Sequence, residues 1–338
     1  MNAIRRAPVV AIAAALLALA ACSSSSSAPS ASPTTAAPTP RSSTTTRSTT
    51  APSTTTSRPT TPGTTTTARC ALGPGFAPGT AVHQMVVDGE QRELIVHVPP
   101  APSARMRLVV DFHGATSNMQ QQDLYSGFDQ LADRDHFVVA TPNGIDAAVR
   151  QWRFLNPKDI DFAKAIVANL ARNACVDPAH AYATGISSGG AMTTSLACRA
   201  SDVFAGFAPV AAEFYNPVYC GNARVRPIVI FHGSADAIVP YAGGRVATNG
   251  GLSVRNTEAT AAQWANHNGC TAGPVTTHLG SEVTRFTWNG CKAPVVLYRI
   301  DGGGHTWPGG TVDVPRLGLT THQIKATDTM WKFFSQYG

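Results

Sequence analysis

Residues 181–190 read Ala-Tyr-Ala-Thr-Gly-Ile-Ser-Ser-Gly-Gly, which contains the pattern Gly-x-Ser-x-Gly with Gly185, Ser187 and Gly189 at its fixed positions. The residues before the pattern predict a strand, and those after it predict a helix. A serine in a sharp turn between a strand and a helix has an exposed hydroxyl, and the glycines allow the backbone to pack tightly around it. Glycine and serine are common residues, so the pattern gains its weight from this setting. Ser187 is therefore a candidate nucleophile.

Short apolar runs alternate with helical patterns on both sides of this segment. Strands are predicted at 93–98, 108–112, 137–140, 181–184, 206–210, 228–231 and 295–300, and helices at 125–134, 159–173, 189–199, 257–267 and 321–337. Such alternation predicts a mainly parallel sheet with helices on both faces. Residues 70–338 are long enough for one α/β domain with a large core. Because the turn at Ser187 resembles the nucleophile elbow of α/β-hydrolases, we expect the α/β-hydrolase fold.

A serine nucleophile needs a base that takes its proton and an acid that orients the base. In α/β-hydrolases the acid and then the histidine follow the serine along the chain. Asp236 follows one predicted strand, and His305 lies in a glycine-rich loop after another. The carboxyl ends of parallel strands share one edge of the sheet, so we predict a triad of Ser187, Asp236 and His305. Asp301 is a weaker candidate for the acid, and His232 is better interpreted as structural.

An oxyanion hole needs two backbone N–H groups that point at the developing negative charge. One is predicted to be that of Ser188, the residue after the nucleophile. The other should lie in the segment His-Gly-Ala-Thr that follows an early strand. We choose Ala115 for this donor, with Gly114 and Thr116 as alternatives. Asp111 lies in the same otherwise apolar strand, and a buried carboxyl there needs a polar partner.

Four segments resemble those of a known family. They read Asp-Phe-His-Gly at 111–114, Thr-Gly-Ile-Ser-Ser-Gly-Gly-Ala-Met at 184–192, Phe-His-Gly-Ser-Ala-Asp at 231–236 and Gly-Gly-Gly-His-Thr-Trp-Pro-Gly at 302–309. They are similar to segments of the polyhydroxybutyrate (PHB) depolymerase and feruloyl/acetylxylan esterase family of α/β-hydrolases, including its actinobacterial lipoprotein members. The resemblance covers about residues 85–338.

This resemblance implies the same triad of Ser187, Asp236 and His305, with no metal and no organic cofactor. It also implies hydrolysis of esters whose acyl part is a hydroxyalkanoate, an aromatic acid or acetate. Trp307, two residues after His305, is a candidate for stacking on an aromatic or sugar ring of the substrate, with a packing role as the alternative.

The first 69 residues have a different composition. Residues 1–22 contain the basic pair Arg5-Arg6 followed by an apolar stretch at 8–20 that is too short to span a bilayer, which predicts an export signal. The stretch ends in Leu-Ala-Ala-Cys, which resembles a bacterial lipobox and predicts lipidation of Cys22, with a plain signal peptide as the alternative. Of the 47 residues 23–69, 36 are Ser, Thr or Pro, so this linker should be disordered. Residues 70–338 form the predicted catalytic domain.

The net charge of +6 belongs to this N-terminal region. It contains six arginines and no acidic residue, and residues 70–338 hold 20 basic and 20 acidic residues. A neutral domain argues against nucleic acid as a partner. We expect contact with the membrane only through the lipid anchor, on the outer face of the cell membrane or in the cell wall.

Six cysteines follow Cys22, and an even number in an exported chain suggests disulfides. Local spacing favours the pairs Cys198–Cys220 and Cys270–Cys291, which leaves Cys70–Cys175. No cluster of cysteine and histidine has the spacing of zinc ligands.

The sequence thus predicts a lipid-anchored, extracytoplasmic serine esterase that acts on an ester substrate. Two alternatives stay open. One is a cell-envelope acyltransferase that uses the same triad with an alcohol as acceptor, and the other is a non-catalytic lipoprotein that binds the cell wall. The sequence fixes neither the acyl specificity nor the oligomeric state.

Overall fold

The structure is a computed structural model that describes residues 71–145, 150–212, 220, 222–247 and 251–337. The predicted signal peptide with Cys22, the predicted linker at 23–69 and Cys70 lie outside these residues. The predictions made for them are therefore carried forward only as proposals.

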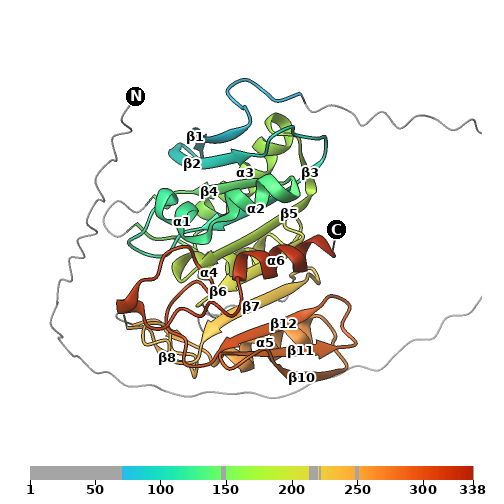
Figure 1. The fold of residues 1–338 in the computed structure, drawn as a ribbon. Helices are drawn as coiled ribbons and strands as arrows, with labels where there is room; N and C mark the ends of the chain where they lie inside the picture. The colour runs from blue at the N-terminus through green and yellow to red at the C-terminus, as the bar shows by residue number, and fades with distance from the viewer. Residues whose placement is uncertain (1–70, 146–149, 213–219, 221, 248–250, 338) are drawn as a thin grey trace, which may run out of the picture. The chain divides into compact units, whose positions relative to one another are not determined.

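Ten strands of the described chain form one sheet (Figure 1). Their spatial order is β1 (Gly79–Val87), β2 (Glu90–Val98), β4 (Val138–Pro142), β3 (Met106–Phe112), β5 (Val176–Ile186), β6 (Gly206–Val210), β7 (Ile228–Gly233), β12 (Val295–Ile300), β11 (Val283–Asn289) and β10 (Ala272–His278). The strands from β4 to β12 in this order are parallel to their neighbours, whereas β1, β2, β11 and β10 pair antiparallel at the two ends. A separate two-stranded sheet contains β8 (Gly244–Arg245) and β9 (Ser253–Val254).

Helices cover both faces of the large sheet (Figure 1). In chain order they are α1 (Met119–Ser126), α2 (Phe128–Asp135), α3 (Pro157–Asn173), α4 (Ser188–Arg199), α5 (Thr257–His267) and α6 (Ala326–Ser335), with a short 3-10 helix at Pro315–Leu317. Strand β3 shows how the core divides. Leu108 and Val110 pack in the cluster that contains residues of α3, α4 and α5, whereas Val109 packs with residues of α2 and α6. Successive side chains of a strand point to opposite faces, which explains the division.

The predicted α/β-hydrolase architecture is confirmed. The strands predicted at 206–210 and 295–300 and the helix predicted at 257–267 have the bounds that the structure gives to β6, β12 and α5. The helix predicted at 321–337 is shorter, because α6 begins at Ala326 and ends at Ser335.

Two predicted disulfides are confirmed: Cys198 pairs with Cys220, and Cys270 pairs with Cys291. Cys175 is also disulfide-bonded, and its predicted partner Cys70 lies outside the described residues. Disulfides are typical of proteins that fold in an oxidising compartment.

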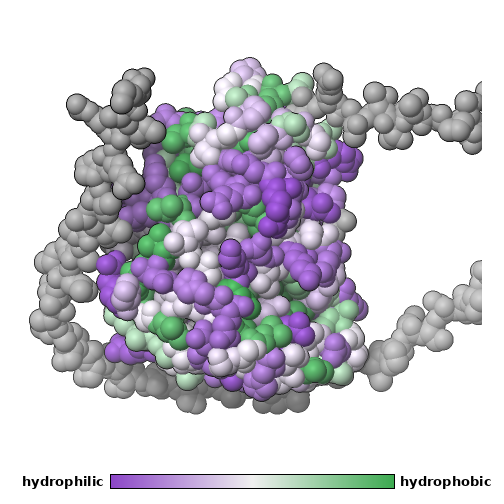
Figure 2. Space-filling view, in the orientation of Figure 1, coloured by the Kyte–Doolittle hydropathy of each residue, from purple (hydrophilic) through white to green (hydrophobic). Residues whose placement is uncertain are grey.

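The face of the molecule in Figure 2 mixes hydrophilic with hydrophobic residues, as most protein surfaces do. Some exposed apolar side chains belong to the edge strands of the sheet, among them Val82 and Val86 in β1 and Val275 in β10. Over the described ranges, no helix has both the length and the apolar character that a membrane span requires.

Four loops leave the sheet at one edge, because β3, β5, β7 and β12 point in the same direction. The residues that follow these strands include Ala115, Ser187, Asp236 and His305, respectively. The topology thus gathers the predicted site at the carboxyl edge of the parallel strands, where open α/β sheets place their sites.

Candidate active site

Ser187 forms the turn between β5 and α4. Its backbone has φ 57° and ψ −118°, which is a strained conformation for a residue with a side chain. Its N–H donates to the Val210 carbonyl oxygen at 2.9 Å, and its own carbonyl oxygen accepts from Ala191 N at 2.8 Å. These bonds anchor the turn to β6 and to the first turn of α4, and the Ser187 side chain is half-buried.

The glycines of the pattern are required by close packing. A Cβ on Gly189 would overlap the Phe112 carbonyl group at the end of β3, and a Cβ on Gly185 would come to 2.5 Å of the same oxygen. A Cβ on Gly190 would lie 2.8 Å from the Val210 carbonyl oxygen of β6. The start of α4 therefore lies directly on the ends of its neighbouring strands, which is possible only without side chains.

Asp236 and His305 are in contact. Asp236 Oδ2 lies 2.7 Å from His305 Nδ1, and both residues are buried. Asp236 Oδ1 accepts hydrogen bonds from Ile238 N and Val239 N, each at 2.8 Å. Burial opposes ionisation of this carboxyl, but the hydrogen bonds from His232 and His305 outweigh it and hold the pKa of Asp236 well below its usual range. An ionised carboxylate only accepts, so His305 Nδ1 carries a proton and Nε2 is left as the acceptor.

The loop that carries His305 is held by its own backbone. His305 N donates to the Leu317 carbonyl oxygen at 2.7 Å, and Gly304 N donates to the Leu319 carbonyl oxygen at 3.0 Å. A Cβ on Gly304 would overlap the Leu317 carbonyl oxygen. This explains why a glycine precedes the histidine here.

The segment after β3 lies beside the serine. A Cβ on Gly114 would be 3.5 Å from the Ser187 Cβ atom. Thr116 N already donates to the Arg150 carbonyl oxygen at 3.0 Å, which removes Thr116 from the possible oxyanion donors. Ala115 is half-buried, and Ser188 is the first residue of α4. A helix N-terminus presents N–H groups that are free of partners within the helix.

The remaining contact of the predicted triad is the one between the serine and the histidine. Among the described residues, no hydrogen bond joins Ser187 Oγ to His305 Nε2. Asp301, the weaker candidate for the acid, instead accepts from Arg299 Nε and Thr284 Oγ1, each at 2.6 Å. Catalytic hydrogen bonds are often long in a substrate-free enzyme and tighten when substrate binds.

Comparison with known proteins identifies the family. Residues 93–224 match the family model described as esterase PHB depolymerase. A protein named "Putative esterase NocK" from Nocardia uniformis subsp. tsuyamanensis is 30% identical over 289 residues, which cover 75% of this chain and 82% of that protein. Feruloyl esterase B from Piromyces equi is 30% identical over 211 residues, which cover 59% of this chain and 39% of that protein.

This chain belongs to the PHB depolymerase and feruloyl esterase family. It is a carboxylic ester hydrolase, which sets aside the alternative of a non-catalytic cell-wall protein. Among solved structures, acetyl xylan esterase from Aspergillus awamori superposes with a TM-score of 0.55 at 16% identity, over 75% of this chain and 99% of that one. This likeness shows the α/β-hydrolase fold of the esterase.

The prediction that Trp307 stacks on a substrate is corrected by the structure of the esterase. Trp307 is fully buried, and its Nε1–H donates to Thr327 Oγ1 at 3.0 Å. Phe128 packs edge-on against the Trp307 ring. The backbone N–H of Trp307 donates to Tyr125 Oη at 2.9 Å. Trp307 is therefore a packing residue, and its contacts hold the chain that follows His305.

The polar partner that the sequence requires for Asp111 is the side chain of Gln122. Asp111 is fully buried, and its Oδ1 accepts from Gln122 Nε2 at 2.9 Å. Burial raises the pKa of Asp111 to about 7. Over the described residues, no group of three or more His, Cys, Asp or Glu side chains is arranged to hold a metal ion.

Proposed function

We propose that this esterase cleaves carboxylic esters with Ser187 as nucleophile, His305 as general base and acid, and Asp236 as the residue that orients His305. The contact of 2.7 Å between Asp236 Oδ2 and His305 Nδ1 carries the proposal, because it leaves Nε2 free to accept a proton. The strained turn at Ser187 and its position on the same edge of the sheet support it further.

In the first half of the reaction, Ser187 Oγ attacks the ester carbonyl carbon while its proton moves to His305 Nε2. The carbonyl oxygen becomes an oxyanion, which the N–H groups of Ala115 and Ser188 stabilise. The bond between carbon and the alcohol oxygen then breaks. The alcohol leaves with the proton from His305, and the acyl group stays on Ser187.

In the second half, His305 Nε2 accepts a proton from a water molecule, whose oxygen attacks the acyl carbon. The same two N–H groups stabilise the second oxyanion. Its collapse releases the carboxylic acid and returns the proton to Ser187. Asp236 stays ionised throughout and stabilises the imidazolium form of His305.

The substrate class follows from the family. Several relatives are named feruloyl esterases, and the matching family model is that of PHB depolymerase. We infer esters whose acyl part is a hydroxyalkanoate, an aromatic acid or acetate, and whose alcohol part belongs to a polymer. No cofactor is needed for this chemistry, because the nucleophile, the base and the oxyanion donors all come from the chain.

We also infer that the esterase works outside the cytoplasm on a lipid anchor. Residues 1–22 have the pattern of a lipoprotein signal that ends at Cys22, and residues 23–69 have the composition of a tether for the domain at 70–338. The two disulfides within the described domain support export. Two or more acyl chains on one protein give stable membrane binding.

The catalytic proposal is tested with a fluorophosphonate probe and an ester panel. Wild type should react with the probe, and Ser187→Ala should not. The panel contains p-nitrophenyl esters, methyl ferulate, acetylated xylan and hydroxybutyrate oligomers, and Ser187→Ala should lose activity on every ester that wild type cleaves. Equal labelling of both proteins would exclude Ser187 as the nucleophile. Transfer of the acyl group to a sugar acceptor in preference to water would instead identify the acyltransferase.

The anchor is tested by fractionation of cells that express the full chain. Wild type should be found with membranes, and Cys22→Ala should be released. Labelling with a radioactive fatty acid should follow the same difference. If Cys22→Ala stayed with membranes and wild type took up no label, the lipid anchor would be excluded while the esterase proposal stood.

A further inference from the structure

Trp152 lies between the two segments that carry the proposed oxyanion donors. It is buried, with 1% of its surface exposed. Its indole Nε1–H donates to the His113 carbonyl oxygen at 2.9 Å, and its backbone N–H donates to Ser188 Oγ at 3.1 Å. Ser188 opens α4, and His113 is two residues before Ala115. One residue therefore bonds to both segments.

His113 fixes the peptide group that bears the Ala115 N–H. Its Nε2 accepts from Gly144 N at 2.9 Å, so its proton is on Nδ1, which lies 2.7 Å from the Gly114 carbonyl oxygen. Burial lowers the pKa of His113 to about 4, so the ring is neutral near pH 7. In a trans peptide the carbonyl and the next N–H point in opposite directions. A hydrogen bond that holds the Gly114 carbonyl thus also sets the direction of the Ala115 N–H.

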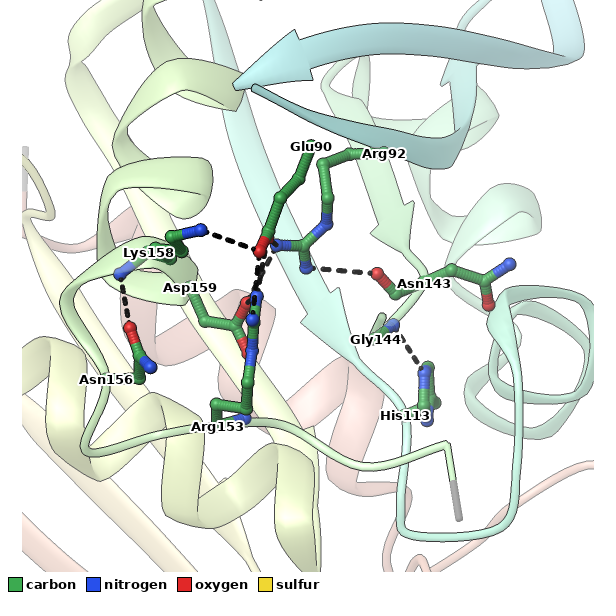
Figure 3. A network of polar contacts seen from close by, with 9 residues as sticks. All are labelled: Glu90, Arg92, His113, Asn143, Gly144, Arg153, Asn156, Lys158 and Asp159. Atoms are coloured by element: carbon green, nitrogen blue, oxygen red, sulfur yellow. Dashed lines mark hydrogen bonds and ion pairs between the residues drawn. The ribbon is translucent and has the colours of Figure 1, made fainter. Parts of the chain in front are cut away.

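A network of charged side chains holds Arg153, the residue after Trp152 (Figure 3). Arg153 N donates to Asp159 Oδ2 at 2.7 Å, and Arg153 Nη2 lies 2.8 Å from Asp159 Oδ1 and 2.7 Å from Glu90 Oε2. Arg92 Nη1 reaches the same Asp159 oxygen at 2.7 Å. Asp159 is fully buried, and both arginines satisfy its charge. The backbone next to Trp152 is therefore held by hydrogen bonds to a network of charged side chains.

The same network reaches the His113 side of the site. Arg92 Nη2 donates to the Asn143 carbonyl oxygen at 3.3 Å, and the next residue, Gly144, donates to His113 (Figure 3). Gly144 has no room for a side chain, because a Cβ there would lie 2.7 Å from the Gln151 carbonyl oxygen. The backbone on both sides of the site is thus hydrogen-bonded to one network of charged side chains, centred on the buried pair Arg92 and Asp159.

We propose that Trp152 is a positioning residue of the oxyanion hole, which holds the segment at His113 and the start of α4 at a fixed separation. The N–H groups of Ala115 and Ser188 then converge on one oxygen atom. This inference rests on the proposed function. Full negative charge develops on that oxygen only during the reaction, so a looser separation should lower kcat and leave KM nearly unchanged.

The test replaces Trp152 with phenylalanine, which removes the indole N–H and keeps an aromatic ring against Phe112, whose centroid is 5.0 Å from that of Trp152. We expect kcat to fall about 10-fold, which is less than the loss of a whole oxyanion donor. A trifluoromethyl ketone forms a hemiketal oxyanion on the serine and reports on the hole directly. Its inhibition constant should rise by the same factor as kcat/KM falls.

Trp331→Phe is the matched control. Trp331 is a buried tryptophan of α6 that stacks on Phe137 at 3.7 Å and hydrogen-bonds Asp135. The Trp331→Phe variant should lose about as much thermal stability as Trp152→Phe does. It should keep the wild-type kcat and inhibitor affinity. An equal loss of kcat in Trp152→Phe and Trp331→Phe would show that Trp152 acts only through packing.

Ser188→Ala gives a second, independent variant. It keeps the Ser188 N–H and removes the oxygen that accepts from Trp152 N, so it should also lower kcat and inhibitor affinity together. It decides the question if Trp152→Phe does not fold. Wild-type kcat and inhibitor affinity in the folded variants would overturn the inference. That outcome differs from failure of the proposed function, in which Ser187→Ala would keep its esterase activity.

Discussion

His232 Nε2 lies 3.3 Å from Asp236 Oδ2, the oxygen that also contacts His305 Nδ1. The same nitrogen lies 2.8 Å from the Val239 carbonyl oxygen, which can only accept, so Nε2 of His232 carries a proton. Two imidazoles thus direct N–H groups at one buried carboxylate. His232 is fully buried and comes from the end of β7, which makes it a fixed support behind the proposed acid.

Replacement of His232 by leucine should therefore lower esterase activity. Asp236 would keep the N–H groups of Ile238 and Val239 but lose one donor to Oδ2, so its direction toward His305 would be less defined. We expect kcat/KM to fall about 10-fold. His232→Gln places an amide N–H near the position of Nε2 and should recover most of the loss. An equal fall of kcat/KM in His232→Leu and His232→Gln would show that the N–H donor to Asp236 Oδ2 does not affect activity.

Asp236→Asn should be far more damaging than Asp301→Asn. An amide at position 236 favours the wrong tautomer of His305, and the corresponding change in other serine hydrolases lowers kcat by about 10⁴. Asp301 is bonded to Arg299 and Thr284, so Asp301→Asn should retain activity within about 3-fold of wild type. Steady-state kinetics on one p-nitrophenyl ester compares the pair. A larger loss at Asp301 would reassign the acid.

Gly189→Ala should destabilise the domain, because its Cβ would overlap the Phe112 carbonyl group. Overpacking against backbone cannot be relieved by a change of rotamer, so we expect a loss of about 3 kcal/mol in the free energy of unfolding. Gly251→Ala is the control, since a Cβ there would have no neighbour within 4 Å. Urea unfolding measures both variants. A stable Gly189→Ala protein with wild-type activity would contradict the packing argument.

The central strands were predictable because parallel strands buried on both faces read as continuous apolar runs. Strand β6 (Gly206–Val210) is buried throughout and was predicted with its correct bounds. No strand is predicted from the sequence at the antiparallel strands β1, β10 and β11. Six of the seven residues of β10 are exposed, so its sequence carries no apolar signal. It is a strand because β11 supplies hydrogen-bond partners, which depend on the fold.

Candidate site residues were predictable where topology determines their position. Loops after parallel strands must share an edge, so the placement of Asp236 and His305 followed from the order of the elements. Side-chain direction did not follow. Trp307 lies two residues after His305 in the chain, but its side chain is buried in the core. Trp152 belongs to no sequence motif, although it contacts both sides of the proposed oxyanion hole. These contacts join residues far apart in the chain, and no local pattern records them.

Asp111 should make the stability of the domain depend on pH. Its pKa in the folded protein is about 7, against an ordinary value of 3.8, so the folded state binds more protons than the unfolded state between these values. Stability should therefore fall as the pH rises from about 4 to about 7, and the full penalty should remain at higher pH. For a pKa difference of this size the penalty is at most about 4 kcal/mol.

Asp111→Asn removes this dependence, because an amide does not ionise and its side chain still has an oxygen that can accept from Gln122. Relative to wild type, the variant should gain about 2–4 kcal/mol in the free energy of unfolding when the pH is raised from 5 to 8. Urea unfolding at the two pH values measures the gain. Asp88→Asn, at an exposed turn between β1 and β2, should show no such change. If the difference in unfolding free energy between the variant and wild type were the same at pH 5 and pH 8, Asp111 would already be ionised at pH 5. Burial would then not hold its proton.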